Sequence, residues 1–401
     1  MQHDTIAWGV WMPATDVVVI GGGCTGSSTA FWLASRYRQR VTLLEQRTVS
    51  SGPTGRSSGI VRMHYSYDPL IRLALRSREI FAHFDEVVGG SADFKRTGFL
   101  LLAPPAQEAM VVANVRLQQR LGVATSVLGR DAIAGLDPRL RTDDVGAGVY
   151  EPDSGYADGY ATATGFAVAA RRHGAEVREA TPALRVLVDG NRVTGVETPA
   201  GRIAAGAVLV AGGPWTRGLL APLGVDLPIR TTRHQVVLLE TPPQVAPLKP
   251  VLVDLGTGIY VRPDVGGQFL IGSIEEGPDE VVSPDAFNEG TDFDFVERVS
   301  RRLVHRVPAF SGVAVKGGYA SLYDVTPDWQ PILGAVPDTA GLFVAAGFSG
   351  HGFKLSPALG EALAGLVVEG RSDAVDLAMF RVSRFAEGAL IHSPYAHGIV
   401  G

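Results

Sequence analysis

The stretch DVVVIGGGCTG, residues 16–26, decides the fold of this chain. A β-branched run leads into a cluster of glycines, and a helical pattern of apolar residues follows over 27–37. A second β-like run at 41–44 ends at Glu45. Strand, tight turn, helix and strand make a βαβ unit whose two strands are parallel and buried. We therefore expect an α/β protein that opens with a doubly wound, Rossmann-like unit.

The glycine-rich turn fits the pattern G-x-G-x-x-G, which holds the pyrophosphate of a dinucleotide. Gly21 permits the turn, Gly23 lets the pyrophosphate approach the backbone, and Gly26 lets the helix pack closely on the strand. Glu45 follows after about 20 residues, the spacing expected for the carboxylate that binds a ribose hydroxyl. A glycine turn that binds no ligand, beside a surface glutamate, is the simpler alternative. The joint pattern favours a dinucleotide site, but this loop alone does not choose between NAD and FAD.

The chain closes with the same order of elements with which it opens. A buried-type strand at 342–346 runs into the glycine-rich residues 347–352, and a helix is predicted at 356–369. A further break, AGGPW at 211–215, follows a β-rich run at 207–210 and would let a cofactor approach the backbone. The nucleotide-binding domain is therefore expected to be discontinuous.

Composition excludes several other classes of protein. The chain has 401 residues, of which 46% are hydrophobic and 19% charged, so it can bury one large core or two joined ones. A net charge of -5 and the lack of basic runs disfavour nucleic acid, and no apolar stretch reaches the ~20 residues of a membrane span. The single cysteine, Cys24, excludes an intrachain disulfide and a cysteine-built metal site, and it is more simply a small loop residue than a redox group. Residues 1–15 lack the features of a secretory signal, so we expect a cytoplasmic protein. We expect no metal site.

Four segments resemble the D-amino-acid oxidase superfamily of flavoproteins, in particular its sarcosine oxidase, dimethylglycine dehydrogenase and glycine oxidase branch. They are GRSSGIVR at 55–62, AGGPW at 211–215, TPDWQPILG at 326–334 and AGFSGHGFK at 346–354. The resemblance covers nearly all of the chain from residue 16 to about 370. It implies bound FAD and the oxidation of a small amine or amino acid.

A change of pattern along the chain predicts a second domain. Between the glycine-rich segments, short β-rich runs separated by glycine and proline turns predict a largely antiparallel sheet with helices. We expect an N-terminal extension at 1–15, an FAD-binding domain formed by 16–90, 150–225 and 325–390, and a substrate-binding domain formed by 91–149 and 226–324.

Site residues are carried over from the resemblance. Lys354 would reach both the flavin and a substrate carboxylate, Arg62 would form the other half of a carboxylate clamp, and Tyr323 and Tyr260 would be further catalytic residues at the cavity. Arg62 could instead be a surface arginine, and the two tyrosines could be mere walls. His351 could touch the flavin through its backbone or be a simple loop histidine. The expected cofactor site comprises Gly21, Gly23, Cys24, Thr25, Gly26, Glu45, Gln46, Arg56, Ser57, Ser58, Gly59, Ala183, Ala211, Gly212, Trp215, Gly347, Phe348, Ser349, Gly350, His351, Gly352 and Lys354.

The chemistry of these residue types suits the transfer of a hydride from the carbon beside an amine nitrogen. The protein has to orient the substrate and to place charge. An arginine fork grips both oxygens of a carboxylate, while a lysine supplies a point charge. The same lysine charge stabilises the negative charge that develops on the reduced flavin.

Two departures from the family pattern concern the flavin. Monomeric sarcosine oxidases bond the flavin through a cysteine where this chain has Ser321, and the histidine used by dimethylglycine-type enzymes falls near Arg56. We therefore expect non-covalent FAD. The oxygen-activating lysine of the monomeric enzymes is missing, because residues 268–272 contain none, and Gly59 replaces a second arginine. Both differences favour a dehydrogenase without excluding an oxidase, and the electron acceptor is oxygen, a protein or a quinone.

Three functions are considered. The leading one is a flavoenzyme that oxidises a secondary amine or α-amino acid to an imine, which water hydrolyses. The second is an electron-transferring flavoprotein subunit of a heteromeric amine dehydrogenase complex, for which a carboxylate clamp would be unnecessary. The third, an NAD-linked dehydrogenase, leaves the segment 347–354 unexplained. The oligomeric state is left open.

Overall fold

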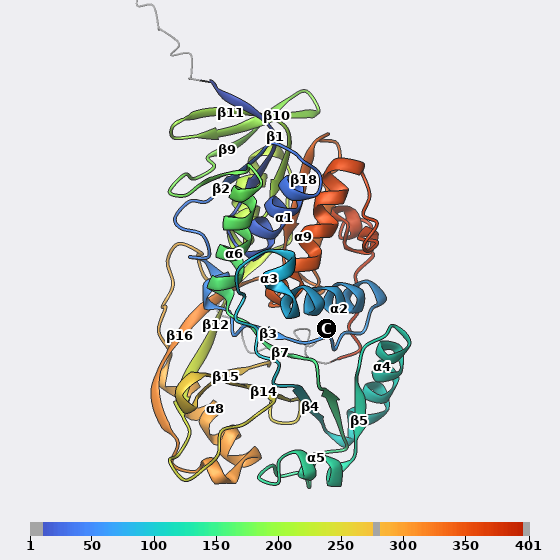
Figure 1. The fold of residues 1–401 in the computed structure, drawn as a ribbon, viewed down its shortest axis with the longest axis vertical. Helices are drawn as coiled ribbons and strands as arrows, with labels where there is room; N and C mark the ends of the chain where they lie inside the picture. The colour runs from blue at the N-terminus through green and yellow to red at the C-terminus, as the bar shows by residue number, and fades with distance from the viewer. Residues whose placement is uncertain (1–10, 276–280, 396–401) are drawn as a thin grey trace, which may run out of the picture.

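The computed structural model describes residues 11–275 and 281–395 and shows two large sheets joined by helices and loops (Figure 1). In this part of the chain the first sheet has eight strands drawn from three separate stretches. Its path is β17 (Ile332–Ala335), β18 (Leu342–Ala346), β11 (Gly201–Val210), β1 (Trp11–Ile20), β2 (Val41–Leu44) and β8 (Glu176–Arg178), with β10 (Arg192–Thr198) beside β11 and β9 (Arg185–Asp189) beside β10.

Strand β1 is longer at its start than the sequence predicts. The strand was expected over 16–20, but Trp11, Met12 and Thr15 also pair with β11, opposite Arg202, Ile203 and Ala205. The expected N-terminal extension of residues 1–15 is therefore shortened, and its first ten residues lie outside the described part of the chain.

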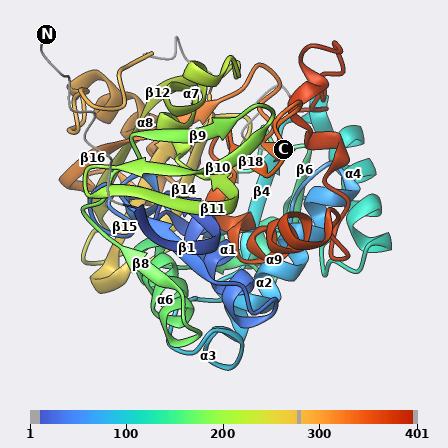
Figure 2. The same ribbon diagram turned by 90° about the horizontal axis from the view of Figure 1, so that it is seen from above.

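Helices cover one face of this sheet, as the view from above shows (Figure 2). The helices are α1 (Cys24–Ser35), α2 (Asp68–Ala82), α3 (Phe84–Val87), α6 (Gly159–Arg172) and α9 (Gly352–Glu369). Helices α1 and α9 lie against each other, since a Cβ on Gly360 would come within 2.2 Å of the Ser28 hydroxyl. The carbonyl of Pro357 accepts hydrogen bonds from Ser28 and Trp32 at 3.2 and 3.1 Å. The helix after the first glycine-rich turn is thus fixed to the helix after the last one.

The second sheet also has eight strands in the described residues, in the lower half of Figure 1. Its order is β16 (Ala314–Val325), β12 (Arg230–Glu240), β15 (Gln268–Ser273), β14 (Ile259–Pro263), β13 (Val251–Asp254), β4 (Phe99–Ala103), β6 (Ala147–Glu151) and β5 (Ser126–Leu128). Only the β13–β4 pairing is parallel. Helices α4 (Glu108–Arg120), α5 (Arg130–Leu136) and α8 (Phe293–Arg306) accompany it. The expected mixed α/β fold class is confirmed, and we propose that the two sheets mark the two expected domains.

Shorter elements complete the fold. Strands β3 (Ile60–Val61) and β7 (Gly155–Tyr156) pair between the two sheets, and α7 (Thr216–Leu220) follows β11. Because β1, β11 and β18 run parallel, their carboxyl ends lie at one edge of the first sheet. The three turns that follow these strands therefore meet at that edge, although they lie far apart in the sequence.

The chain after α9 returns to the first sheet in two 3-10 turns, Ala378–Phe380 and Val382–Arg384. There Arg384 forms an ion pair with Asp328 at 2.9 Å, and the two side chains are 0% and 1% exposed. The amide of Ile391 donates to the same carboxylate at 3.2 Å. Asp328, in the TPDWQPILG segment, thus anchors the C-terminal segment.

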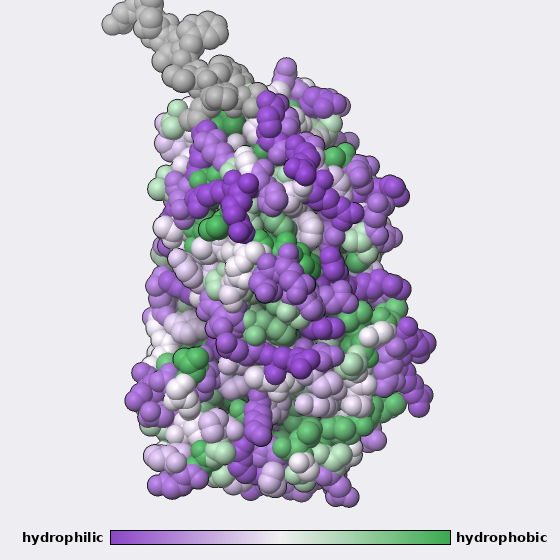
Figure 3. Space-filling view, in the orientation of Figure 1, coloured by the Kyte–Doolittle hydropathy of each residue, from purple (hydrophilic) through white to green (hydrophobic). Residues whose placement is uncertain are grey.

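On the face shown in Figure 3, hydrophilic residues surround small hydrophobic groups, the most extended of which lies where Figure 1 places β5 and α5. Val127 and Leu136 of these elements are 40% and 43% exposed. Within 11–275 and 281–395, no helix combines the length and the apolar character needed to cross a membrane.

Candidate active site

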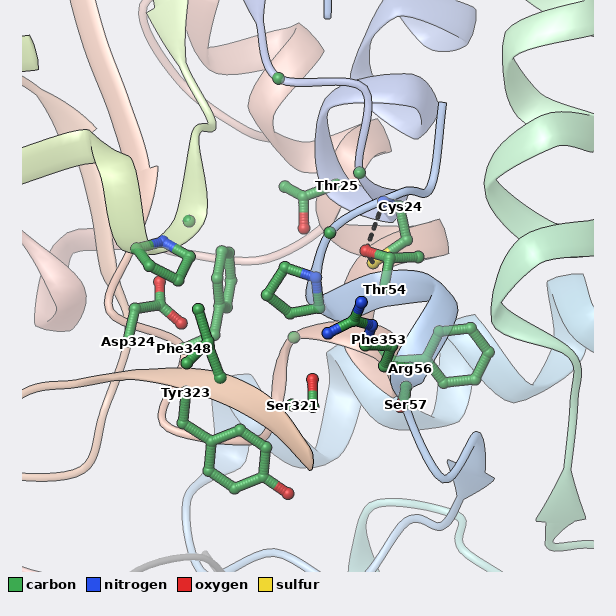
Figure 4. A pocket seen from close by; sticks show the side chains of 18 of the residues that line it. Cys24, Thr25, Thr54, Arg56, Ser57, Ser321, Tyr323, Asp324, Phe348 and Phe353 are labelled. Carbon is green, nitrogen blue, oxygen red and sulfur yellow. Dashed lines mark hydrogen bonds between the residues drawn. The ribbon is translucent and has the colours of Figure 1, made fainter. Parts of the chain in front are cut away.

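A cavity of about 480 Å³ lies where the two sheets meet. Its lining includes Gly21 and Ala211 from the edge of the first sheet, and Tyr260 and Tyr323 from the second. Figure 4 shows the start of α1 on one side of this space and β16 on the other. The cavity therefore brings together residues from distant parts of the chain.

The first glycine-rich turn leaves no room for side chains at two positions. Gly21 has φ +111°, and a Cβ there would lie 2.3 Å from the carbonyl oxygen of Ala211. A Cβ on Gly26 would lie 2.0 Å from the carbonyl oxygen of Gly21. Gly21 lines the cavity, whereas Gly26 packs behind it. Beside the turn, the amide of Cys24 donates to the Thr54 hydroxyl at 3.1 Å (Figure 4), which fixes the start of α1.

Glu45 stands at the end of β2 and lines the same cavity. Its carboxylate accepts hydrogen bonds from the amides of Gly22 at 2.8 Å and Arg47 at 2.9 Å. The turn and the carboxylate, which the sequence placed about 20 residues apart, are therefore in direct contact. Gln46 and Ala183, also expected at the site, line the cavity as well.

The segment 53–59 forms another wall. Arg56 and Ser57 come from this segment in Figure 4, and Ser58 lines the cavity beside them. Arg56 forms an ion pair with Glu289 at 2.8 Å and thereby connects the loop before α8 to the cavity wall. Gly59 lies outside the lining: it has φ +68°, and a Cβ there would lie 2.0 Å from the carbonyl oxygen of Ala157.

The closing glycine-rich loop is divided between lining and support. Phe348, Gly350 and Gly352 line the cavity, as do Gly212 and Trp215 from the turn after β11. The predicted residues Gly347, Ser349 and His351 do not. The amide of Gly347 donates to Asp324, the Ser349 hydroxyl lies 3.2 Å from the amide nitrogen of Thr326, and His351 Nδ1 lies 3.2 Å from the Tyr65 hydroxyl. These three residues hold the loop from behind.

Asp324 is a cavity residue that the sequence analysis missed. Its carboxylate accepts from the amide of Gly347 at 2.6 Å, and its carbonyl accepts from the amide of Ser349 at 3.0 Å. Burial raises the pKa of the Asp324 carboxyl to about 6, although backbone N–H groups, including that of Phe348, act in the opposite direction. Asp324 therefore connects β16 to the closing loop.

Two buried cations, Lys354 and Arg62, line the cavity and are 8% and 5% exposed. Lys354 Nζ donates to the carbonyl of Gly350 at 3.2 Å. Burial, and then the charge of Arg62, hold the pKa of Lys354 well below its ordinary value. Arg62 donates to the carbonyl of His64 and lies over the Tyr65 ring, 4.6 Å from its centroid.

Aromatic side chains form the wall on the side of the second sheet. The ring of Tyr323 stacks on His234 with 3.7 Å between centroids. Burial, and then the neighbouring Tyr319, raise the pKa of Tyr323 to about 12, while burial lowers the pKa of His234 to about 3. Burial likewise raises the pKa of Tyr260 well above its usual value. The tyrosines stay protonated and His234 neutral at physiological pH. His234 had no assignment from the sequence, because nothing local marks it as a stacking partner.

The arrangement suits an extended dinucleotide. One cavity is lined at once by the α1 turn, including Gly23, by Glu45 and by Lys354, and the close packing at Gly21 and Gly26 fixes the shape of the turn. Such a fold and cavity define the class of dinucleotide-binding proteins.

The family model described as FAD dependent oxidoreductase, DAO, matches residues 16–366. The chain therefore belongs to the DAO family, as the sequence indicated, and its cofactor is FAD. Glycine oxidase from Geobacillus kaustophilus is 29% identical over 377 residues, which cover 92% of this chain and 97% of that protein. Sarcosine oxidase subunit beta from Rhodobacter capsulatus is 29% identical over 398 residues, which cover 96% of this chain and 92% of that protein.

Among solved structures, L-proline dehydrogenase from P. horikoshii has a TM-score of 0.86 and 29% sequence identity. The match covers 95% of this chain and 100% of that protein's chain. The protein is therefore an oxidoreductase of the type that oxidises amines or amino acids. The expected FAD is confirmed, and the third alternative, an NAD-linked dehydrogenase, does not hold, because the family model is that of FAD-dependent oxidoreductases.

Proposed function

We propose that the protein oxidises the C–N bond of a small secondary amine or amino acid, and that the resulting imine is hydrolysed by water. One observation carries the proposal: two buried basic side chains, Arg62 and Lys354, line the cavity that also contains the dinucleotide turn. A substrate carboxylate in this cavity would form charge-assisted hydrogen bonds with such groups.

Arg62 and Lys354 would have different roles at the site. The Arg62 guanidinium is held in place by the His64 carbonyl and the Tyr65 ring, and its planar shape suits a carboxylate. FAD, when bound, supplies the hydride acceptor. Lys354, in the first turn of α9, would place its charge near both the cofactor and the substrate.

The low pKa of Lys354 fits this role. Burial and the charge of Arg62 lower this pKa in the structure, and an anion beside both groups would raise it again. Substrate binding would thus favour the charged form of Lys354, and that charge would stabilise negative charge on the reduced cofactor. Tyr323 and Tyr260 would enclose the substrate and exclude water.

We also propose that FAD is held non-covalently. Ser321 and Arg56 line the cavity. By the sequence resemblance, Ser321 matches the bonding cysteine of monomeric sarcosine oxidases, and the bonding histidine of dimethylglycine-type enzymes falls near Arg56. Neither a serine hydroxyl nor a guanidinium forms the corresponding thioether or imidazole link. Denaturation of the yellow protein in acid would release all of its flavin into the supernatant; flavin that stays with the precipitate would contradict the proposal.

The test of the proposed function is the anaerobic bleaching of the flavin by sarcosine, glycine, proline, N-methyl amines and D-amino acids. At least one carboxylated amine should reduce the flavin, and the matched amine without the carboxylate should do so poorly. Failure of the whole panel with a fully flavinated protein would refute the proposal. Adding oxygen, a quinone or a redox protein to the reduced enzyme would identify the electron acceptor.

A second candidate is an electron-transferring subunit of a heteromeric amine dehydrogenase complex. It is supported by the similarity to a relative that is itself named as a subunit, the subunit beta of sarcosine oxidase. Direct bleaching of the isolated chain by substrate would exclude this candidate. Bleaching only after a partner protein is added would favour it.

A further inference from the structure

The described chain ends at Tyr395, whose side chain is 5% exposed. Its ring belongs to the hydrophobic cluster that also contains Ile60, Phe99, Val253 and Tyr260. These four residues line the cavity. The C-terminal segment therefore packs behind the cavity wall that the second sheet provides.

The Tyr395 hydroxyl is also part of a buried hydrogen-bond cluster. It is bonded to His64 Nε2, and Asn114 Nδ2 of α4 donates to it at 3.0 Å. One turn further along α4, Gln118 Nε2 lies 3.1 Å from His64 Nδ1 and donates to the carbonyl of Tyr65 at 2.9 Å. The segment 64–65, helix α4 and the C-terminal segment thus meet in one place.

The donors in this cluster can be assigned. The amide nitrogen Nε2 of Gln118 can only donate a hydrogen bond, so His64 Nδ1 must be the acceptor. The ring hydrogen of the neutral His64 is therefore on its own Nε2. Burial, and then the charge of Arg62, lower the pKa of His64 to about 3, so the ring is neutral. His64 therefore donates to the Tyr395 oxygen, which accepts from Asn114 as well. The phenol oxygen is the common acceptor for two buried donors.

The cluster is directly linked to the proposed carboxylate clamp. Arg62 donates to the backbone carbonyl of His64 and its guanidinium lies over the Tyr65 ring. Any shift of the His64 ring or backbone would move the acceptor that orients Arg62. A second tie from the same C-terminal segment, from the Tyr67 hydroxyl to the carbonyl of His392, holds this strand-to-helix connection.

We propose that Tyr395 is a positioning residue for substrate binding: through His64 it fixes the orientation of the Arg62 guanidinium toward the cavity. The C-terminal segment is thereby part of the substrate end of the site. The inference rests on the proposed function, because it assumes that Arg62 binds the carboxylate. Its consequence is specific, since a positioning residue should affect carboxylate affinity more than the limiting rate.

The test is Tyr395→Phe in the flavinated full chain. The variant keeps the ring but removes the acceptor of two buried hydrogen bonds. We expect the dissociation constant for acetate, followed by the change in flavin absorption, to rise about tenfold. The concentration of substrate that half-saturates anaerobic flavin reduction should rise by a similar factor, while the limiting reduction rate stays within about twofold. Asn114→Ala, which removes one donor, should shift both constants in the same direction by less.

Tyr160→Phe is the control, because the Tyr160 side chain is 62% exposed and does not line the cavity. It should leave all three constants unchanged. If the wild-type protein is reduced by an amine and Tyr395→Phe has wild-type constants, the inference falls and the proposed function stands. If acetate binds more weakly to Tyr395→Phe but no amine reduces either protein, the inference stands and the proposed function falls. A variant that loses the limiting rate but keeps its affinities would also overturn the inference.

Discussion

Replacing Arg384 by methionine tests how the C-terminal segment is held. The guanidinium donates to both carboxylate oxygens of Asp328, at 2.9 and 3.0 Å, and to the carbonyl of Gln330 at 2.8 Å. Methionine would fill most of the volume but would supply neither charge nor donors. The Asp328 carboxylate would then stay buried without its partner.

The expected loss is large. Removing one partner of a buried ion pair costs about 3–5 kcal/mol. With a urea dependence of about 3 kcal/mol per molar, the upper part of the range for small proteins, the midpoint of unfolding should fall by about 1 M or more. Because ligand binding also stabilises the folded state, the measurement compares far-UV circular dichroism of both proteins at the same large excess of FAD.

The control is Arg381→Met. Arg381 pairs with Glu387 at the surface, where each side chain is 43% exposed. Exposed pairs contribute about 0–1 kcal/mol, so this midpoint should barely move. Equal midpoints for Arg384→Met and Arg381→Met would refute the reasoning.

The pH dependence gives the same pair a second signature. Burial alone would raise the pKa of Asp328, but the hydrogen bonds and charge of Arg384 outweigh it and leave the pKa below its usual value. The folded state therefore binds this proton less tightly than the unfolded state. The contribution to stability is present above the unfolded pKa of about 4 and is lost as the pH falls through the lower folded value. Arg384→Met should weaken this acid dependence.

Four further predictions concern the site. Lys354→Met should keep the yellow colour but slow flavin reduction by carboxylated substrates at least tenfold, by analogy with other lost electrostatic partners; the surface variant Lys316→Met should match wild type, and equal rates in both variants would remove Lys354 from the mechanism. Arg62→Ala should chiefly weaken substrate binding, by about 2 kcal/mol or more for a charged hydrogen bond, and unchanged half-saturation in anaerobic titrations would contradict its assignment. Gly21→Ala should abolish retention of FAD on gel filtration, because its Cβ would lie 2.3 Å from the Ala211 oxygen, whereas Gly90→Ala, with similar φ of +117° but open space around it, should retain FAD. Asp324→Asn should flatten the pH dependence of apoprotein stability, since a carboxyl whose folded pKa is raised to about 6 makes stability fall as pH rises from about 4 to about 6; a variant with the wild-type slope would show that Asp324 is not the titrating group.

The parts of the fold that follow from local rules were predictable. The βαβ unit at 16–45 was visible because strand, glycine turn and helix leave marks within a few residues of one another. The closing loop at 347–352 repeats the same pattern, and both turns line one cavity. The early start of β1 at Trp11 was missed, because its pairing with residues 202–205 depends on a strand far away in the sequence.

The supporting contacts were not predictable in this way. Asp328 could be recognised as part of a motif, but its partner Arg384 lies in a segment without a pattern of its own. Asp324 stands in an ordinary strand, and only the fold brings its carboxylate to the amide of Gly347. The environment of Arg62 likewise depends on Tyr395, which no periodicity marks. Local sequence thus indicates which groups carry chemistry, while the groups that orient them come from packing.

The place of β18 in the first sheet has a consequence for synthesis of the protein. The nucleotide turn at 21–26 leaves the ribosome early, but the edge on which it depends is completed by β11 at 201–210 and by β18 at 342–346. A nascent chain that has not yet reached residue 346 therefore lacks one side of the cofactor cleft. FAD capture has to wait until β18 has been synthesised, and a truncated chain that ends before residue 342 would carry a complete glycine motif yet remain colourless.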